Sequence, residues 1–153
     1  MMTRLFTAML MLATCLAATL PAHALRVDNF TLLDHRGDAH ELYYHRAAPA
    51  IVMLVQGNGC PIVRNAITDY EALQAQYADQ GVKFFMLNSN LQDQRASIAA
   101  EAEKYGIDVP ILDDETQLIG ESLGLVRTGE ILVIDPQSWS IAYRGPINDR
   151  PLS

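Results

Sequence analysis

Residues 55–65 read VQGNGCPIVRN, and this stretch decides the fold of the chain. An apolar run ends at Val55, glycines follow at positions 57 and 59, and Cys60 directly precedes Pro61. Proline suits the first position of a helix because it has no N–H to leave unpaired and its φ angle is already helical. The stretch therefore predicts a turn from a strand into a helix, with Cys60 at the helix N-terminus.

The segments on either side of this turn alternate between strand and helix patterns. Residues 50–55 form an unbroken apolar run, which is typical of a strand buried on both faces. After the turn, one apolar face repeats every three or four residues and predicts a helix that ends near Gly81. The members of this face are Ile62, Ala66, Tyr70, Leu73 and Tyr77. Further along, the patterns predict strands over 82–87 and 110–112 and helices over 93–105 and 116–123.

Short segments at both ends of this region predict antiparallel pairs. These are a strand over 27–33, a turn over 34–38, a returning strand over 41–44, and a hairpin of strands over 131–134 and 140–143. Alternating strands and helices followed by an antiparallel pair predict an α/β domain with a central mixed sheet flanked by helices. Ligands in such sheets bind at the carboxyl ends of the strands, where residues 57–60 and 88–90 both lie.

The first 24 residues have the pattern of a cleaved secretory signal peptide. Arg4 precedes an apolar run, and Ala22-His23-Ala24 supplies a small-x-small cleavage site. The uninterrupted apolar run is only about 16 residues long, short of the roughly 20 that a membrane-spanning helix needs. An alternative is lipoprotein processing at Cys15, which the preceding residues match loosely. We therefore expect residues 1–24 to be a signal peptide, residues 25–153 to be one domain, and the mature protein to be periplasmic or secreted without a membrane span.

The mature chain is acidic and has one cysteine. Losing Arg4 leaves 10 basic residues against the 18 acidic ones, a formal charge of −8. Such a charge argues against nucleic acid and anionic membranes as partners. Losing Cys15 leaves Cys60 alone, so an intramolecular disulfide is excluded and Cys60 is either buried and inert or exposed and reactive.

The neighbours of Cys60 favour the reactive alternative. A helix N-terminus offers unpaired N–H groups and the positive end of the helix dipole, and both stabilise a thiolate. Arg64 lies one helical turn further on, on the same face. Gly57 and Gly59 allow the backbone to approach a ligand closely. The opposing interpretation is a buried cysteine that packs as a small apolar residue.

Cys60-Pro61-Ile62-Val63 resembles the active-site segment of the thioredoxin superfamily. It is most similar to the redoxin group that contains alkyl hydroperoxide reductase and thiol-specific antioxidant (peroxiredoxin-like) proteins. Four more segments carry the resemblance in the same order, FFMLNSN at 84–90, YGIDVPILDD at 105–114, LGLVRTGEILVID at 123–135 and IAYRGPINDR at 141–150. The resemblance covers residues 27–150 and implies a thioredoxin-like fold and a thiol-dependent oxidoreductase.

Three positions depart from the family pattern. Val63 stands where a second active-site cysteine is expected, so dithiol–disulfide exchange within the site is excluded. Gly57 replaces the threonine that typical peroxiredoxins carry three residues before the reactive cysteine, and Gly129 replaces a cis-proline after Thr128. The resemblance with these changes implies a single-cysteine mechanism, in which an external thiol reductant or a partner redox protein resolves the oxidised Cys60.

The end of the sequence departs from the family as well. The resemblance implies a closing helix after the last hairpin, but the sequence stops at Pro151-Leu152-Ser153. We therefore expect a thioredoxin-like domain without the usual C-terminal helix. A homodimer would cover the sheet face, and otherwise that face is unusually exposed.

Candidate site residues fall into two groups. Cys60 and Arg64 are the predicted catalytic residues. The predicted substrate-binding residues are Gly59, Pro61, Asn88, Asn90, Arg127, Thr128 and Gly129. For the two asparagines a simple strand ending is an equal alternative, and for Arg127 the alternative is a solvated side chain at a turn.

No cofactor and no metal are expected. His35, His40 and His45 recur every five residues, which fits surface histidines better than a metal-ligand set. Residues 113–115 are three acids before a predicted helix, and a helix cap explains them more simply than a cation site. The sequence thus predicts an exported thiol-dependent oxidoreductase that reduces peroxide or a disulfide. The alternative is a non-catalytic thioredoxin-fold module that binds a metal or a partner protein.

Overall fold

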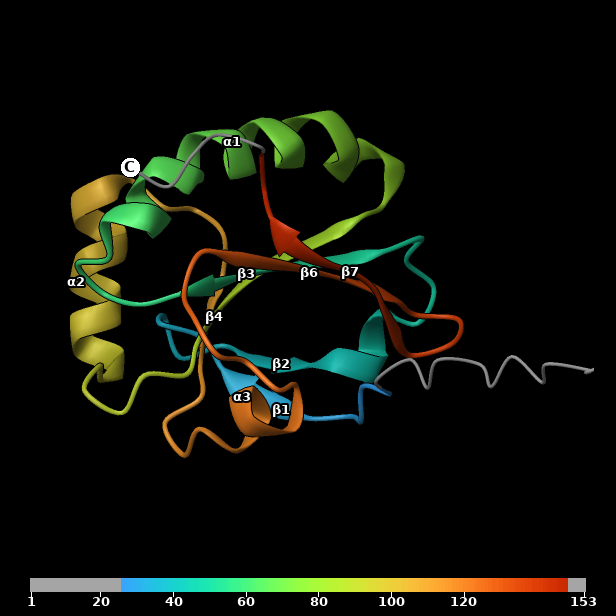
Figure 1. Ribbon diagram of the computed structural model, residues 1–153, viewed down its shortest axis with the longest axis horizontal. Helices are drawn as coiled ribbons and strands as arrows, with labels where there is room; N and C mark the ends of the chain where they lie inside the picture. Colours follow the sequence, from blue (N-terminus) through green and yellow to red (C-terminus); the bar gives the residue numbers. More distant parts are fainter. Residues whose placement is uncertain (1–25, 149–153) are drawn as a thin grey trace, which may run out of the picture.

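A computed structural model describes residues 26–148, so the predicted signal peptide and the last five residues lie outside the described part. A five-stranded mixed sheet in the order β5-β4-β3-β6-β7 forms the centre of the molecule (Figure 1). β3 (Ile51–Gln56) is buried along its whole length and pairs parallel with β4 (Lys83–Asn88). The apolar runs that predict these two strands fit this position, because a central strand has helices or loops on both faces.

The remaining strands complete the sheet on either side of this central pair. β5 (Ile111–Asp113) extends it parallel to β4, whereas β6 (Glu130–Asp135) pairs antiparallel with β3. β7 (Ser140–Pro146) forms the outer edge as the return strand of the β6–β7 hairpin. The expected α/β fold with a central mixed sheet and an antiparallel edge is confirmed.

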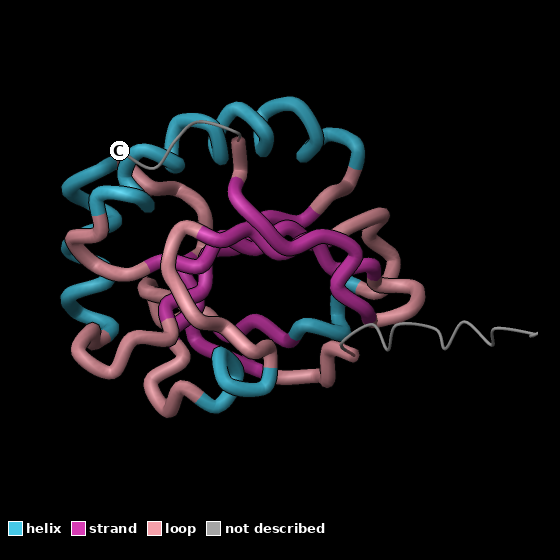
Figure 2. The backbone as a smooth tube through the Cα atoms, in the orientation of Figure 1, coloured by secondary structure: helices cyan, strands magenta, loops and turns pink. Residues whose placement is uncertain are grey.

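Different elements cover the two faces of the sheet (Figure 2). α1 (Pro61–Tyr77) and α2 (Arg95–Tyr105) pack on one face, where Val63, Ala66 and Ile98 are buried. The other face is covered by the small β1–β2 hairpin, a 3-10 turn and the short helix α3 (Leu118–Ser122), which lie below the sheet in Figure 1. Each face of the sheet thus has its own layer of covering elements.

The N-terminal strands are shorter than the sequence predicts. β1 spans only Thr31–Leu33. The residues before it lie outside any strand, apart from a single bridge at Arg26. β2 spans Ala39–Glu41, and the predicted strand over 41–44 is wrong because Leu42–His45 form a 3-10 helix, η1. This helix buries Leu42 under the sheet.

Two details of the helices also differ from the prediction. Residues 78–80 form a 3-10 extension of α1, η2 (Ala78–Gln80), and Gly81 ends it with a φ of +89°, as the pattern predicts. Ile62, however, does not belong to the buried face of α1, because its side chain is 37% exposed while Val63 is 3% exposed. α2 begins at Arg95 rather than at residue 93, with Gln94 and Ser97 forming a capping box.

On the α1 side of the sheet, part of the β6–β7 hairpin stays open to solvent. Tyr143 on β7 is 45% exposed, and Val133 beside it on β6 is only partly buried. Within residues 26–148 the elements that cover this face are α1 and α2. No helix in that range is both long enough and apolar enough to cross a membrane.

Candidate active site

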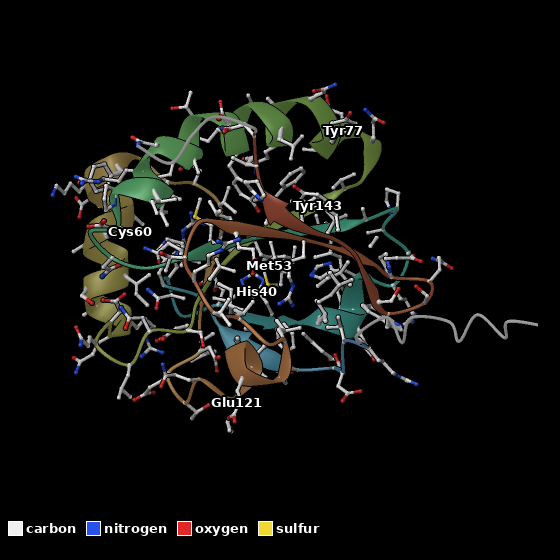
Figure 3. The ribbon with its side chains drawn as sticks, in the orientation of Figure 1. His40, Met53, Cys60, Tyr77, Glu121 and Tyr143 are labelled. Carbon is white, nitrogen blue, oxygen red and sulfur yellow. The ribbon has the colours of Figure 1, made fainter. Side chains whose placement is uncertain are left out.

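Cys60 lies at the point where β3 gives way to α1. It is the N-cap residue of α1, with an extended backbone (φ −69°, ψ 118°), and Pro61 takes the first helical position. Figure 3 shows Cys60 and Tyr77 at opposite ends of α1, with Cys60 at the end nearer to α2. The side chain is half-buried, and Cys60 is the free cysteine of the described chain. The local prediction for this turn is confirmed.

A hydroxyl group contacts the sulfur from across the site. Thr128 Oγ1 lies 3.1 Å from Cys60 Sγ, within hydrogen-bonding distance. Gly57 makes this approach possible, because a Cβ atom at that position would lie 2.9 Å from Thr128 Cγ2. The glycine that replaces the family threonine therefore leaves room for a threonine from another element.

The environment of Cys60 favours its thiolate form. Burial alone would raise the pKa of the thiol, but the hydrogen bond with Thr128 and the backbone N–H groups of Val63 and Ile62 together hold it below its ordinary value. Both N–H groups belong to the first turn of α1, where backbone N–H groups have no partner within the helix and the positive end of its dipole lies. A lowered pKa increases the fraction of nucleophilic thiolate near neutral pH.

Arg64 is hydrogen-bonded to a side chain of α2. Its Nη1 donates to the hydroxyl of Tyr105 on α2 at 3.2 Å, and its guanidinium carbon lies 5.9 Å from the centre of the same ring. Its charge is the smallest of the influences that lower the pKa of Cys60. Arg64 thus acts on Cys60 through its charge at a distance, without a direct hydrogen bond.

Two acidic residues near α2 hold the loop that precedes Cys60. Asn58 N–H donates to Asp93 Oδ2 at 2.9 Å, and Gly59 N–H donates to Glu101 Oε1 at 2.8 Å. Gly59 has a φ of +71°, a left-handed conformation that side chains rarely adopt. The loop is therefore fixed by hydrogen bonds from its own N–H groups. Sequence reasoning missed Asp93 and Glu101, because each lies about forty residues from its partner and no spacing pattern links the two.

Asn88 and Asn90 belong to the same network. Asn88 is 1% exposed, and its amide nitrogen donates to Gln56 Oε1 and to Asp93 Oδ2. Asn90 also donates its amide to Asp93 Oδ2, at 3.1 Å. Both side chains thus hold the ends of β3 and β4 together, and Asn90 also lines a cavity.

This cavity, of about 630 Å³, opens beside Thr128. Its lining comes from the ends of β3 and β4, from α3 and from the segment before β6, and includes Gln56, Asn90, Gln117, Glu121, Arg127 and Thr128. Arg127 is an exposed side chain whose Nε lies 4.0 Å from Glu130 Oε1. Thr128 is the lining residue that also touches Cys60, so it connects the cavity with the sulfur.

Gly129 lies on the other side of Thr128, and an apolar side chain covers it. Its φ is +81°, and its N–H donates to the carbonyl of Val55 at 2.7 Å. A Cβ atom on Gly129 would lie only 2.5 Å from Ile62 Cγ2. Ile62, which the sequence assigns to the helix core, therefore packs on the backbone beside Cys60.

The position of the missing second cysteine is a core position. Val63 is 3% exposed and packs with Ala66 and Ile67 against the sheet. The two positions after Pro61 thus have different environments, since Ile62 faces the site and Val63 faces the core. No thiol in residues 26–148 is available to resolve an oxidised Cys60 within the chain.

The other predicted polar features have structural partners. His35 is buried and its Nδ1 accepts the N–H of Ile111, so the expectation of a surface histidine is wrong for His35. His40 and His45 are partly exposed, and His40 Nε2 lies 3.0 Å from Asp34 Oδ2. In residues 26–148 no group of three or more His, Cys, Asp or Glu side chains is arranged to hold a metal ion. Asp114 Oδ2 accepts the N–H of Gly120 in α3, as a helix cap does.

The sequence matches one family model. A model described as the AhpC/TSA family matches residues 24–150. A comparison with curated proteins finds no match.

Solved structures share the fold. An uncharacterized conserved protein from Geobacillus kaustophilus superposes with a TM-score of 0.76 at 26% identity, covering 85% of this chain and 72% of that chain. A putative thiol:disulfide interchange protein DsbE from Chlorobium tepidum gives 0.70 at 12% identity, over 80% and 84% of the two chains. The peroxidoxin BcpB from Mycobacterium tuberculosis gives 0.67 at 18% identity, over 79% and 82%. These likenesses establish a thioredoxin-like fold.

Proposed function

The chain belongs to the AhpC/TSA family of thiol-based oxidoreductases and peroxidases, and we propose that it works through Cys60 alone. In this proposal it is an exported enzyme that reduces a peroxide or a disulfide and is itself reduced by an external thiol. The observation that carries the proposal is the 3.1 Å contact between Cys60 Sγ and Thr128 Oγ1 at the N-terminus of α1. A cysteine that serves only as packing has no need of a hydrogen-bond partner at its sulfur.

The chemistry begins with attack by the Cys60 thiolate. With a hydroperoxide, the sulfur forms a bond to the terminal oxygen, the O–O bond breaks, and the departing alkoxide takes a proton to leave as an alcohol or as water. The sulfur is oxidised to sulfenic acid and the peroxide is reduced. With a disulfide, the thiolate forms a mixed disulfide and expels the other sulfur as a thiolate.

Thr128 and Arg64 have different parts in this step. The Thr128 hydroxyl donates to the thiolate before attack, which lowers the pKa of Cys60 and orients the sulfur. Arg64 adds a positive charge from its place beside Tyr105. Gly59, Pro61 and the Thr128–Gly129 backbone shape the space that the substrate enters.

Regeneration of Cys60 depends on a thiol from outside the chain. Val63 is a buried apolar side chain where a second active-site cysteine is expected, so it cannot form a disulfide with Cys60. One external thiol condenses with the sulfenic acid to give a mixed disulfide and water, and a second thiol releases Cys60 as a disulfide of the two external thiols forms. The overall reaction oxidises two thiols for each peroxide reduced.

The test compares the wild-type mature protein with Cys60→Ser. Each is given hydrogen peroxide or a small disulfide together with an excess of a thiol, and consumption of the oxidant is followed above the uncatalysed rate. We expect turnover by the wild type with at least one oxidant and none by Cys60→Ser. Mass spectrometry after a dimedone trap should locate the sulfenic acid on Cys60 when the oxidant is peroxide.

A wild-type protein that consumes neither oxidant faster than Cys60→Ser would overturn the enzyme proposal. That result would favour the non-catalytic binding module. Turnover with one oxidant only would assign the reaction, and the dimedone adduct separates a true peroxidase from a disulfide reductase.

Export and self-association are further parts of the proposal. The signal-like residues 1–24 support transfer to the periplasm or outside the cell, and N-terminal sequencing of the exported protein should begin at Leu25. The partly exposed Tyr143 and Val133 on one sheet face support a homodimer. Sedimentation showing a monomer at micromolar concentrations would contradict the dimer without affecting the chemistry of Cys60.

A further inference from the structure

The main chain beside Cys60 is where a polypeptide substrate would have to bind. An extended peptide binds a protein sheet by laying its backbone along exposed main chain, so that its side chains fall into neighbouring pockets. At this site the main chain next to the sulfur is the Thr128–Gly129 segment at the start of β6, because the Thr128 hydroxyl touches Cys60 Sγ. A polypeptide disulfide that binds in this way would place its strand along this segment to bring its sulfur to Cys60.

Ile62 covers that segment. If Gly129 carried a Cβ atom, that atom would lie 2.5 Å from Ile62 Cγ2 and 3.5 Å from Ile62 Cβ. The side chain is 37% exposed, so it stands on the surface and is not part of the core packing below α1. Gly129 is the partner that allows this contact, because any larger residue there would collide with Ile62.

We propose that Ile62 is a specificity-determining residue that closes the main chain beside Cys60 to extended polypeptides. The Cys60 sulfur then reacts with small electrophiles, such as hydrogen peroxide, short alkyl hydroperoxides or low-molecular-weight disulfides. The same block applies to the reductant, because a partner redox protein would also have to place a loop on this segment. The external thiol is accordingly a small molecule rather than a protein. This inference rests on the proposed function of Cys60 as a reactive thiolate.

The redox steps are those of the single-cysteine scheme with a small partner at each stage. A hydroperoxide accepts two electrons from Cys60 and leaves as an alcohol, and the sulfenic acid takes one small thiol and releases water. A second small thiol then attacks the mixed disulfide, so that Cys60 returns as a thiolate and the two small thiols leave joined as a disulfide. Every partner in this sequence is small enough to reach the sulfur without lying on Gly129.

The test uses two alkylating reagents with the same reactive group and different bulk. One is iodoacetamide, and the other is an extended hexapeptide that carries an iodoacetyl group on a central side chain. The second-order rate constants for Cys60 are measured with both reagents on the wild type, Ile62→Ala and Ile62→Val. Ile62→Val is the matched control because it keeps the β-branched carbon that touches Gly129.

We expect Ile62→Ala to react with the hexapeptide reagent faster than the wild type by about tenfold or more, the range for removal of a steric block from a binding pocket. Its rate with iodoacetamide, and both rates of Ile62→Val, should stay close to those of the wild type. A second control, Val126→Ala, removes an 85% exposed side chain from the segment before β6 and should change neither rate. Far-ultraviolet circular dichroism checks that all variants are folded.

The outcomes separate failure of this inference from failure of the proposed function. If wild-type Cys60 reacts rapidly with iodoacetamide but Ile62→Ala leaves the ratio of the two rate constants unchanged, Ile62 is not a size filter and the inference is wrong. If wild-type Cys60 reacts with iodoacetamide no faster than it does in the urea-unfolded chain, the thiolate itself is absent and the proposed function fails. Efficient reduction of the oxidised wild type by a thioredoxin-type protein would also overturn the inference.

Discussion

The ends of β3 and β4 lie side by side at one edge of the sheet and have opposite properties. At the end of β3, Gly57 leaves room for Thr128, and the sulfur of the partly exposed Cys60 lies against a single hydroxyl group. At the end of β4, Asn88 is buried and its side chain has protein partners on both the nitrogen and the oxygen. In the proposed mechanism, the end of β3 carries the chemistry and the end of β4 holds it in place.

The difference shows how to distinguish a reactive group from its support. Asp93 accepts hydrogen bonds from Asn58, Asn88 and Asn90 through the same oxygen, Oδ2, so this carboxylate joins three polar groups of the loops. Cys60 has one side-chain hydrogen-bond partner and is partly exposed, which is the setting of a reactive cysteine rather than of a support. Buried polar groups with complete hydrogen bonding stabilise a single arrangement of the loops, whereas reactive groups remain incompletely satisfied.

Among substitutions at the two strand ends, the largest expected effect is a loss of stability. Asp93→Ala leaves three donors without their acceptor, so we expect the free energy of unfolding to fall by about 2–4 kcal/mol. Urea denaturation of both proteins measures the difference. Cys60→Ser, at the other strand end, should change it by less than about 0.5 kcal/mol, as is usual for substitutions outside the core.

Asp108→Ala is the control, because it removes an exposed carboxylate. If Asp93→Ala unfolds at the same urea concentration as Asp108→Ala, the network at the end of β4 is not a structural support.

A second prediction concerns the fit between Gly57 and Thr128. Gly57→Ala places a Cβ atom 2.9 Å from Thr128 Cγ2, which should destabilise the protein by about 1–3 kcal/mol and move the hydroxyl off the sulfur. Thr128→Ser removes that methyl group and keeps the hydroxyl. In the Thr128→Ser background the same Gly57→Ala change should therefore cost less, by about 1 kcal/mol. Urea denaturation of all four proteins gives this coupling energy.

Equal costs of Gly57→Ala in the two backgrounds would mean that Thr128 does not depend on the space at Gly57. The glycine at position 57, where the family has threonine, and the threonine at position 128 would then be unrelated.

The smallest expected effect is that of Arg64. Its guanidinium donates to Tyr105, and its charge is the weakest of the influences that lower the pKa of Cys60. Arg64→Gln should therefore raise this pKa, by less than Thr128→Val does, and leave stability nearly unchanged, since exposed charges contribute little. Alkylation rates measured across a pH series compare the two variants. A larger shift from Arg64→Gln would make Arg64 the main support of the thiolate.

Much of the architecture follows from the sequence. The apolar runs of β3, β4 and β6 and the helical repeat of α1 are long enough to set the type and order of the elements. The site at the end of β3 follows as well, because Gly59 and Pro61 mark a strand-to-helix turn around Cys60.

The errors come from contacts between distant parts of the chain. Leu42 lies in a 3-10 helix, and its side chain packs under the sheet. The short polar-apolar pattern around Leu42 fits a strand equally well. Ile62 fits the helical repeat of the core. Its side chain nevertheless lies at the surface, in contact with Gly129, which is 67 positions away along the chain. Such pairings leave no periodic signal, so the role of Ile62 and the partner of Cys60 emerge only from the fold.

One measurement tests the central claim that the end of β3 holds a thiolate. The rate of alkylation of Cys60 by iodoacetamide is measured from pH 5 to pH 10 in the wild type, in Thr128→Val and in the urea-unfolded wild type. Because only the deprotonated sulfur reacts, the rate rises with pH and its midpoint gives the pKa.

We predict a lower midpoint for the folded wild type than for the unfolded chain, and a midpoint for Thr128→Val that moves back toward that of the unfolded chain, because the hydroxyl that stabilises the thiolate is lost. Thr128→Ser, which keeps the hydroxyl, should stay close to the wild type. A folded wild type whose Cys60 titrates at or above the pH of the unfolded thiol would contradict the account.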